Sequence, residues 1–351
     1  MPNLNNETTG KCKVLVTGAS GFIGRAVVGA LVANRCNVVG AMRRPTGASW
    51  AVPSPSLGND ADWRPLLAGK TVVVHTAARA HVLNDRAADP MAEFRRVNMA
   101  GTLQLAEQAA AMGVRRFVFV SSIGVNGAET FQQPFTDKDL VAPHSPYAVS
   151  KYEAELALQA VAAETGMEVI IIRPPLVYGP GAPGNFGSLM RWLKRGVPLP
   201  LGAIHNQRSL VALDNLVDLI VTCLTHPAAA NQTFLVSDGE DVSTTELLRR
   251  MGRAMGRPAR LIPVPVSWLK MAATMVGKQD VAQRLCESLQ VDIEKTRRLL
   301  GWTPPLSLDE GLRRAAGSLI DMIRLIAVSL PRRTLGRSTC KQHHLNQPVW
   351  S

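Results

Sequence analysis

The chain has 351 residues, 46% of them hydrophobic, which is enough for one large α/β domain, alone or with a smaller appendage. Its formal net charge is +12, and the basic residues are dispersed, with local excesses at 249–260 and 332–341. No basic run alternates with aromatic residues, and no nucleic-acid motif is present. We therefore favour a basic surface that suits phosphate-bearing ligands over nucleic-acid or membrane binding.

The cysteines and the N-terminus indicate the compartment. The count of cysteines is odd, and none has metal-ligand spacing, so we expect free thiols in a reducing compartment and no metal site. These residues are Cys12, Cys36, Cys223, Cys286 and Cys340. Residues 1–11 lack the apolar core of a secretory signal, and no apolar run is long enough to span a membrane. We expect a cytoplasmic protein.

Strands and helices alternate over the first half of the chain. Predicted strands are Lys13–Thr17, Asn37–Met42, Thr71–His75, Arg116–Ser121 and Glu168–Arg173. Predicted helices are Phe22–Asn34, Glu93–Met112 and Ser150–Thr165, and a loop is expected over 45–59. Strands separated by helices indicate βαβ units, so we predict an α/β protein with a Rossmann-type, doubly wound parallel sheet.

The second half is organised differently. Proline and glycine are dense over 174–202, and three helices and one strand follow, at Asp214–His226, Thr244–Met255, Ser267–Met275 and Gln232–Val236. This pattern predicts a smaller C-terminal substrate-binding lobe. The expected division is a disordered leader (1–10), a dinucleotide-binding domain (11–173), a mixed lobe that returns to the main sheet (174–330) and a disordered tail (331–351).

A glycine-rich loop joins the first strand to the first helix. The glycines follow the pattern GxxGxxG, which permits a tight turn, a close approach of the backbone to a pyrophosphate and close packing of helix on sheet. The first turn of the helix offers unpaired N–H groups to the anion. The expected contacts are Gly18, Ser20, Gly21, Phe22, Ile23 and Gly24.

The end of the second strand bears on the choice of dinucleotide. An NAD-selective fold usually has an acid near Met42, but Arg43 and Arg44 follow instead. Because two arginines suit a 2′-phosphate, NADP(H) is favoured and NAD(H) stays possible. The alternative is that both are solvated loop charges.

Three polar residues form a candidate catalytic set. Tyr147 and Lys151 are one helical turn apart and share a helix face. A nearby ammonium stabilises a phenolate and lowers its pKa, so we expect a tyrosine that exchanges protons with a sugar oxygen. Ser122 ends a predicted strand at the edge where ligands of such sheets bind.

The glycine loop, the strand-end serines and the Tyr-x-x-x-Lys pattern together resemble the extended short-chain dehydrogenase/reductases. Within them, the chain resembles the UDP-glucose 4-epimerase and nucleotide-sugar reductase branch over roughly residues 12–315. Ser122 precedes Tyr147 by 25 residues, which is the family spacing. The resemblance implies a nucleotide-sugar substrate, a homodimer, and a role in surface-polysaccharide synthesis.

The resemblance also assigns further residues. On the cofactor side it implies contacts or support from Asp60 or Asp62, His75, Ala77, Ala78, Asn98 and Pro174. On the substrate side it implies Asn126, Asn185, Arg208 and Arg284. The chain departs from the pattern at Asn126, where many 4-epimerases have a tyrosine.

Three functions remain open at this stage. The arginines after the second strand favour a reductase that delivers hydride from NADPH to a 4-keto-6-deoxy sugar nucleotide. The alternative is a UDP-hexose 4-epimerase with the same catalytic residues. A non-catalytic dinucleotide sensor is the third, and it is disfavoured because Tyr147 and Lys151 are both present. A dehydratase is disfavoured because no Asp-Glu pair follows Ser122.

Overall fold

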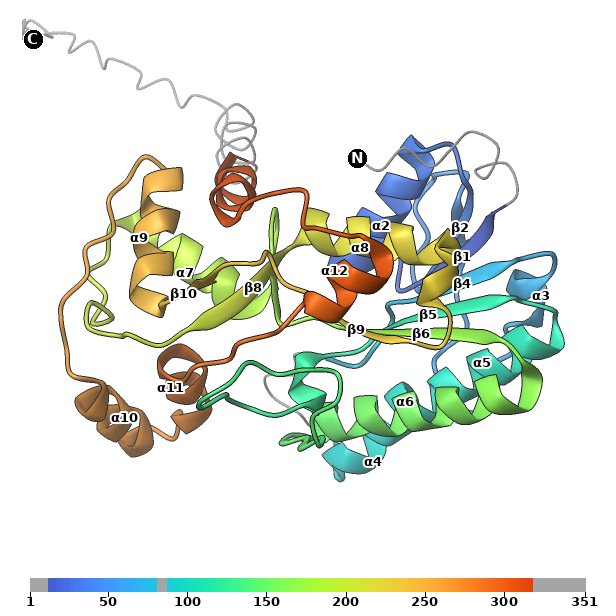
Figure 1. Cartoon of the computed structure of the whole chain (residues 1–351), viewed down its shortest axis with the longest axis horizontal. Helices are drawn as coiled ribbons and strands as arrows, with labels where there is room; N and C mark the ends of the chain where they lie inside the picture. Colours follow the sequence, from blue (N-terminus) through green and yellow to red (C-terminus); the bar gives the residue numbers. More distant parts are fainter. Residues whose placement is uncertain (1–11, 81–86, 318–351) are drawn as a thin grey trace, which may run out of the picture.

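The computed structural model describes residues 12–80 and 87–317 (Figure 1). The expected leader and tail lie outside these residues. The described chain forms a large sheet with helices on both faces and, beside it, a smaller lobe built around a second sheet (Figure 1).

All seven strands of the large sheet are parallel. In spatial order they are β3 (Ala51–Pro53), β2 (Asn37–Met42), β1 (Lys13–Thr17), β4 (Val72–His75), β5 (Arg116–Val120), β6 (Glu168–Arg173) and β9 (Thr233–Leu235). The order reverses between β1 and β4, and ligands of doubly wound sheets bind at this reversal, beyond the carboxyl ends of the strands. The fold class is therefore confirmed.

Alternate side chains of each strand enter two separate cores. Val14 and Val16 of β1 face α2 (Phe22–Ala33) and α8 (Leu213–Thr225). Leu15 points the other way, toward α5 (Gly101–Ala111) and α6 (Pro146–Thr165). Both faces are covered, which is why the strands are continuously apolar.

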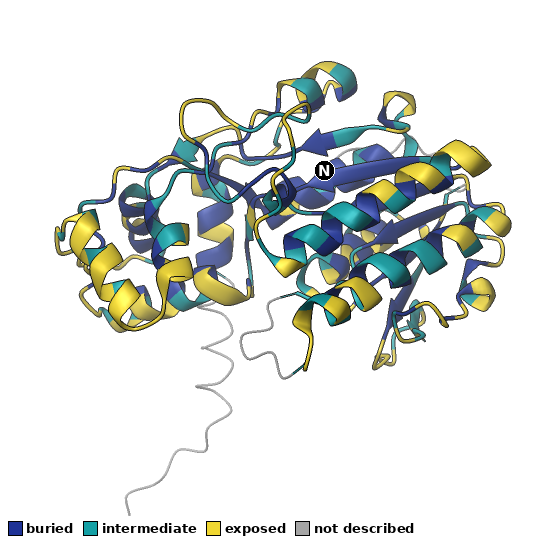
Figure 2. Cartoon of the chain, turned by 90° about the horizontal axis from the view of Figure 1, so that it is seen from below, coloured by how far each residue is buried: buried dark blue, intermediate teal, exposed yellow. Residues whose placement is uncertain are grey.

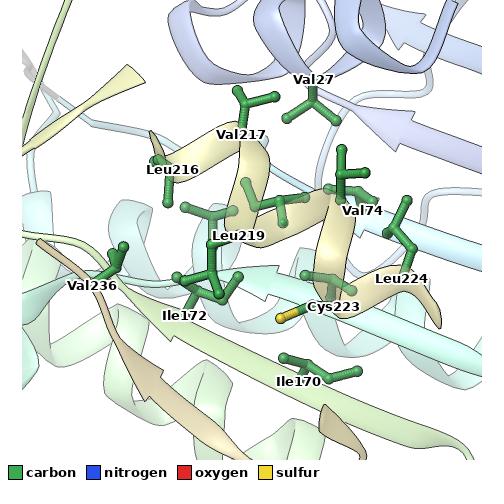
Figure 3. Packing of buried hydrophobic residues seen from close by; sticks show 14 of the residues in the cluster. Val27, Val74, Ile170, Ile172, Leu216, Val217, Leu219, Cys223, Leu224 and Val236 are labelled. Atoms are coloured by element: carbon green, nitrogen blue, oxygen red, sulfur yellow. The ribbon is translucent and has the colours of Figure 1, made fainter. Parts of the chain in front are cut away.

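Helix α8 comes from the second half of the chain but packs on the large sheet. Figure 3 shows Leu219 and Cys223 of α8 above Ile170 and Ile172 of β6. The strand β9 also joins this sheet beside β6. The chain therefore returns to the large sheet after it has contributed strands to the smaller lobe.

The smaller lobe has a three-stranded sheet in the order β10-β8-β7. Its strands are β7 (Leu176–Tyr178), β8 (Arg208–Ala212) and β10 (Asp241–Val242), and its helices are α7 (Gly184–Arg195), α9 (Thr244–Ala254), α10 (Val266–Met275) and α11 (Gln279–Cys286). Tyr178, Phe186 and Leu248 belong to its core, which the helical residues 308–317 complete. Between β9 and this helix lies α12 (Glu294–Leu300). Short turns also form at α3 (Arg64–Leu67), Ile123–Val125 and Pro227–Ala229.

Two of the predicted helices differ from the observed ones by more than one residue. The segment expected to be one helix over Glu93–Met112 is α4 (Pro90–Phe94), a π-helical turn at Arg95–Ala100 and then α5. Helix α6 begins at Pro146 rather than Ser150, because the Ser145 hydroxyl accepts a hydrogen bond from Ala148 N at 3.2 Å. Tyr147 therefore lies inside the first turn of α6.

Candidate active site

The glycine loop lies at the carboxyl end of β1. Gly18 has a φ of +69°, and a Cβ there would lie 2.7 Å from Ala77 N. At Gly24 a Cβ would overlap the Gly18 carbonyl oxygen and lie 2.6 Å from Thr76 Oγ1. No side chain caps the N-terminus of α2, which begins at Phe22. Backbone N–H groups are thus left for an anion, and the loop fits a dinucleotide pyrophosphate.

We expect Gly24→Ala to weaken dinucleotide binding at least about tenfold and to destabilise the fold by about 1–3 kcal/mol, because the new methyl group overlaps backbone. Gly29→Ala is the matched control, since a Cβ at that position of α2 meets nothing within 4 Å. The control should be neutral or slightly stabilising. Cofactor titration and urea unfolding measure both effects. Equal binding by the two variants would contradict the assigned role of the loop.

The residues expected near the adenosine are spread over two loops. Arg43 and Arg44 are exposed after β2, and Met42 is buried. The Asp62 carboxylate is paired with Arg64 at 2.8 Å, while Asp60 lies beside Arg96. Asp60 therefore fits an adenosine contact better than Asp62, whose oxygens are already used.

The strand β4 pairs with β1 and supports the glycine loop. The His75 ring is buried, with Nδ1 2.6 Å from Thr17 Oγ1 and Nε2 2.9 Å from Thr102 Oγ1. Burial and then the charge of Lys151 lower the pKa of His75 to about 3, so the ring stays neutral. The sequence-based expectation that His75 lines the cofactor is corrected for its side chain, which points into the core. Ala77 and Ala78 follow at the edge of the sheet, half-buried.

Asn98 lies in the π-helical turn and links the loop after β4 to α6. Its side-chain oxygen accepts from Arg79 N at 2.7 Å, and its amide nitrogen donates to Ser150 Oγ at 3.0 Å. Ser150 Oγ donates in turn to the Tyr147 carbonyl at 2.8 Å. Asn98 thus supports the first turn of α6 rather than a ligand. Ser150 was not identified from the sequence as a supporting residue, although it stands directly before Lys151.

The electrostatics of Tyr147 and Lys151 differ from expectation. Burial raises the pKa of Tyr147 to about 12 and lowers the pKa of Lys151 to about 7, the latter opposed by the charge of Glu155. The Lys151 ammonium lies 3.9 Å from the centre of the Phe119 ring. The expected lowering of the tyrosine pKa is absent, because burial of the phenol is the cause that acts on it in the protein alone.

The pKa of Lys151 links stability to pH. Between about pH 7 and pH 10.5 the unfolded chain binds a proton that folded Lys151 does not, so the free energy of unfolding rises with pH in this window. Lys151→Met lacks this dependence. We expect cofactor-stripped Lys151→Met to gain most over the wild type near pH 7, with the gain shrinking by about 1 kcal/mol per pH unit toward pH 10. Urea unfolding of both proteins at several pH values measures this, and a constant difference would rule it out.

Ser122 lies where β5 ends, against the first turn of α6. Its Oγ accepts from Gly124 N at 3.1 Å, and a Cβ on Gly124 would lie 3.5 Å from Ala148 Cβ. The Pro174 carbonyl accepts from Ile123 N at 3.0 Å and so fixes the same turn. The structure therefore brings Ser122 to the helix that carries Tyr147 and Lys151.

A buried ion pair holds this turn in place. Arg173 of β6 and Glu155 of α6 approach to 2.5 Å, and Ser121 donates to the same carboxylate. Arg173 Nη1 also donates to Asn126 Oδ1 at 2.9 Å, while Asn126 Nδ2 donates to the Thr136 carbonyl at 2.8 Å. The expectation that Asn126 contacts substrate is corrected, because both ends of its buried amide are already bound.

Arg208 and Arg284 are two cations of the smaller lobe whose charges interact. Burial and then the charge of Arg284 lower the pKa of Arg208 to about 10. The pKa of His144 is also lowered, by burial and then by the charge of Arg284, so the same arginine acts on both groups. Arg208 Nη1 donates to the Glu287 carbonyl at 3.1 Å, and exposed Asn185 lies in the first turn of α7. Two arginines suit a diphosphate. His144, which stands three residues before Tyr147, was not identified from the sequence.

Comparison of the sequence with known proteins identifies the family of this chain. A sequence model of the NAD dependent epimerase/dehydratase family matches residues 14–237. The chain belongs to this family. It is an enzyme of the extended short-chain dehydrogenase/reductase type, and its cofactor is a nicotinamide dinucleotide.

Its relatives match along nearly their whole length. The chain is 46% identical to a UDP-glucose 4-epimerase of Vibrio cholerae, over 88% of this chain and 95% of that protein. It is 30% identical to a UDP-glucose 4-epimerase of Mycolicibacterium smegmatis, over 86% and 96%. The structure of MoeE5 in complex with UDP-glucose and NAD is 26% identical and covers 89% of this chain and 99% of its own, with a TM-score of 0.71.

Proposed function

We propose that this enzyme is a UDP-hexose 4-epimerase. The observation that carries the proposal is the 46% identity to the Vibrio cholerae UDP-glucose 4-epimerase. The placement of Ser122, Tyr147 and Lys151 at one edge of the sheet supports it. The epimerase thereby replaces the reductase that the sequence favoured as the leading function.

The residues divide the work as follows. A bound nicotinamide would supply reversible hydride acceptance at C4 of the hexose. Tyr147 accepts the proton of the C4 hydroxyl and gives it back, and Ser122 orients that oxygen. Lys151 holds the nicotinamide ribose and supplies positive charge beside the phenol. Arg208 and Arg284 hold the diphosphate, which keeps the nucleotide in place while the sugar turns.

Two observations favour a 4-ketoreductase as the second candidate. Arg43 and Arg44 are exposed at the end of β2, where an acid would select NAD. The raised pKa of Tyr147, about 12, also keeps the phenol protonated at neutral pH, and reduction of a ketone consumes that proton. In this version NADPH enters and NADP⁺ leaves in each cycle.

The two functions differ in how the cofactor is used. We expect purified protein to interconvert UDP-glucose and UDP-galactose without added cofactor, and to release NAD⁺ or NADH on denaturation, because an epimerase must keep its dinucleotide through the cycle. A site that is empty after purification, prefers NADPH in titration and consumes it with a UDP-4-keto-6-deoxy sugar would establish the reductase instead. Bound dinucleotide without turnover of either substrate would favour a sensor.

We also propose a homodimer that pairs α5 and α6 with the same helices of a second copy. These two helices lie side by side on one face of the sheet (Figure 1). The outward side of α6 carries exposed Leu156 beside the small residues Ala160 and Ala163, which would allow close helix packing. Light scattering of the purified protein measures the number of copies.

A further inference from the structure

Helix α10, at the far end of the smaller lobe, is apolar on more than one side. Seven of its ten residues are apolar, yet none is buried. Val266 and Leu269 lie partly buried against the core of the lobe. Trp268, Met271 and Met275 are 64%, 55% and 78% exposed. Their spacing of three and seven residues places them on one face, which we call the outer stripe.

Two further apolar residues close to α10 in the sequence are also exposed. Val276, directly after α10, is 66% exposed, and Ile262, on the strand-like segment before it, is 50% exposed. Figure 2, which views the molecule from below, shows the helices at this end of the smaller lobe largely exposed. Single exposed apolar residues are ordinary, whereas a group of them that includes a tryptophan is typical of a surface that binds a protein or a membrane.

The charges around α10 identify the chemistry of that partner. Over residues 257–284 the chain has five basic residues and one acid, Asp280. The basic residues are Arg257, Arg260, Lys270, Lys278 and Arg284. Lys270 is paired with Glu287, while Arg260 and Lys278 are exposed. An apolar face with a tryptophan and flanking cations is complementary to an anionic lipid surface.

The same charges disfavour the other occupants. A second copy of the chain would bring an equally basic α10 region to the contact, and like charges repel. The segment 318–351, outside the described residues, has five basic residues and one acid in its sequence. Because its net charge is also positive, it would be repelled by the basic residues around α10. An anionic bilayer supplies opposite charge and an apolar interior together.

We propose that α10 docks this enzyme on the surface of an anionic lipid bilayer. The outer stripe enters the interfacial layer, and Arg260 and Lys278 contact lipid phosphates. This is peripheral binding, because no helix in the described part of the chain is long and apolar enough to cross a membrane. Helix α11 packs against α10 and carries Arg284, so docking brings the substrate lobe to the lipid surface. The proposal does not depend on which sugar reaction the enzyme catalyses.

Vesicle co-sedimentation of the full-length protein tests the proposal. We expect binding to phosphatidylcholine vesicles that contain about one quarter phosphatidylglycerol, little binding to pure phosphatidylcholine, and release by salt. The triple variant Trp268→Ser/Met271→Gln/Met275→Gln should bind anionic vesicles at least about tenfold more weakly. Arg260→Gln/Lys278→Gln should lose roughly tenfold at low salt.

Controls separate docking from general surface effects. Val32→Gln/Met112→Gln removes two exposed apolar side chains outside the smaller lobe and should bind as the wild type does. The triple variant should keep the urea midpoint of the wild type, since its changed residues are exposed. The Trp268 contribution, obtained by subtracting the emission of Trp268→Phe, should shift to shorter wavelength with anionic vesicles.

Three results would overturn the proposal. One is an absence of binding to anionic vesicles, and another is equal binding by the triple variant and the wild type. The third is an oligomer in light scattering that the triple variant dissolves while neither protein binds vesicles, which would make the outer stripe a contact between copies.

Discussion

Tyr147→Phe should lower kcat by about 10²–10⁴-fold while cofactor affinity stays near that of the wild type. The substitution removes one oxygen, the only atom of this side chain able to exchange a proton with the sugar. The edge-to-face contact of the ring with Phe94, at 6.3 Å between centroids, does not need the hydroxyl. Steady-state kinetics on the UDP-hexose pair and a fluorescence titration with the dinucleotide measure the two quantities separately.

Tyr152→Phe is the matched control for this experiment. Tyr152 lies on the same helix, α6, and has no role in the proposed chemistry. Its variant should keep kcat within about twofold, because the hydroxyl that it loses takes no part in the proposed proton transfer. A Tyr147→Phe enzyme that turns over as fast as this control would show that another group moves the proton, and His144, close to Gly124, would be the next candidate.

The elements with local signals were predictable from the sequence. The glycine loop is contiguous, and it is followed directly by α2, so its turn and helix could be placed within one residue. The strands β1, β2 and β6 were predicted with their observed bounds, because each is a short apolar run between breakers. Tyr147 and Lys151 share a helix face because four residues make about one turn.

The elements that depend on distant contacts were not predictable in the same way. The strands β7 and β8 pair with each other although α7 separates them in the chain, and α7 lies in a stretch rich in proline and glycine. The roles of Asn98 and Asn126 follow from partners far along the chain, at Ser150 and Arg173. A single sequence shows the residue type at such a position, but it does not show which distant residue forms hydrogen bonds with that side chain.

The pKa values of the catalytic pair show a further limit. A sequence that places Lys151 near Tyr147 predicts charge stabilisation of the phenolate, but the sign of the net effect depends on burial. In the folded chain Lys151 lies over Phe119, and burial dominates both groups. A cationic nicotinamide beside the phenol would restore the expected direction, since a positive charge favours the phenolate. We therefore expect the protonation state of Tyr147 to depend on whether the cofactor is bound.

Arg173→Met should destabilise the protein by about 3–5 kcal/mol, because it leaves the Glu155 carboxylate buried without its cation. Asn126 would lose the guanidinium that donates to its Oδ1, whereas Ser121 would keep its bond to Glu155. Arg115→Met is the control, since that arginine is exposed and its pair with Glu168 is long, at 3.4 Å. Urea unfolding measures both free energies, and the control should change by less than about 1 kcal/mol.

The double variant Arg173→Met/Glu155→Leu separates stability from positioning. Apolar replacement of a buried ion pair is often neutral for stability, so most of the free energy of unfolding should return. Turnover should not return, because Ser121 loses the acceptor that holds the end of β5 beside Ser122, and Lys151 loses the carboxylate that raises its pKa. Recovery of stability with full activity would show that the pair only holds the fold. Recovery of stability alone would show that Glu155 and Arg173 position the catalytic residues as well.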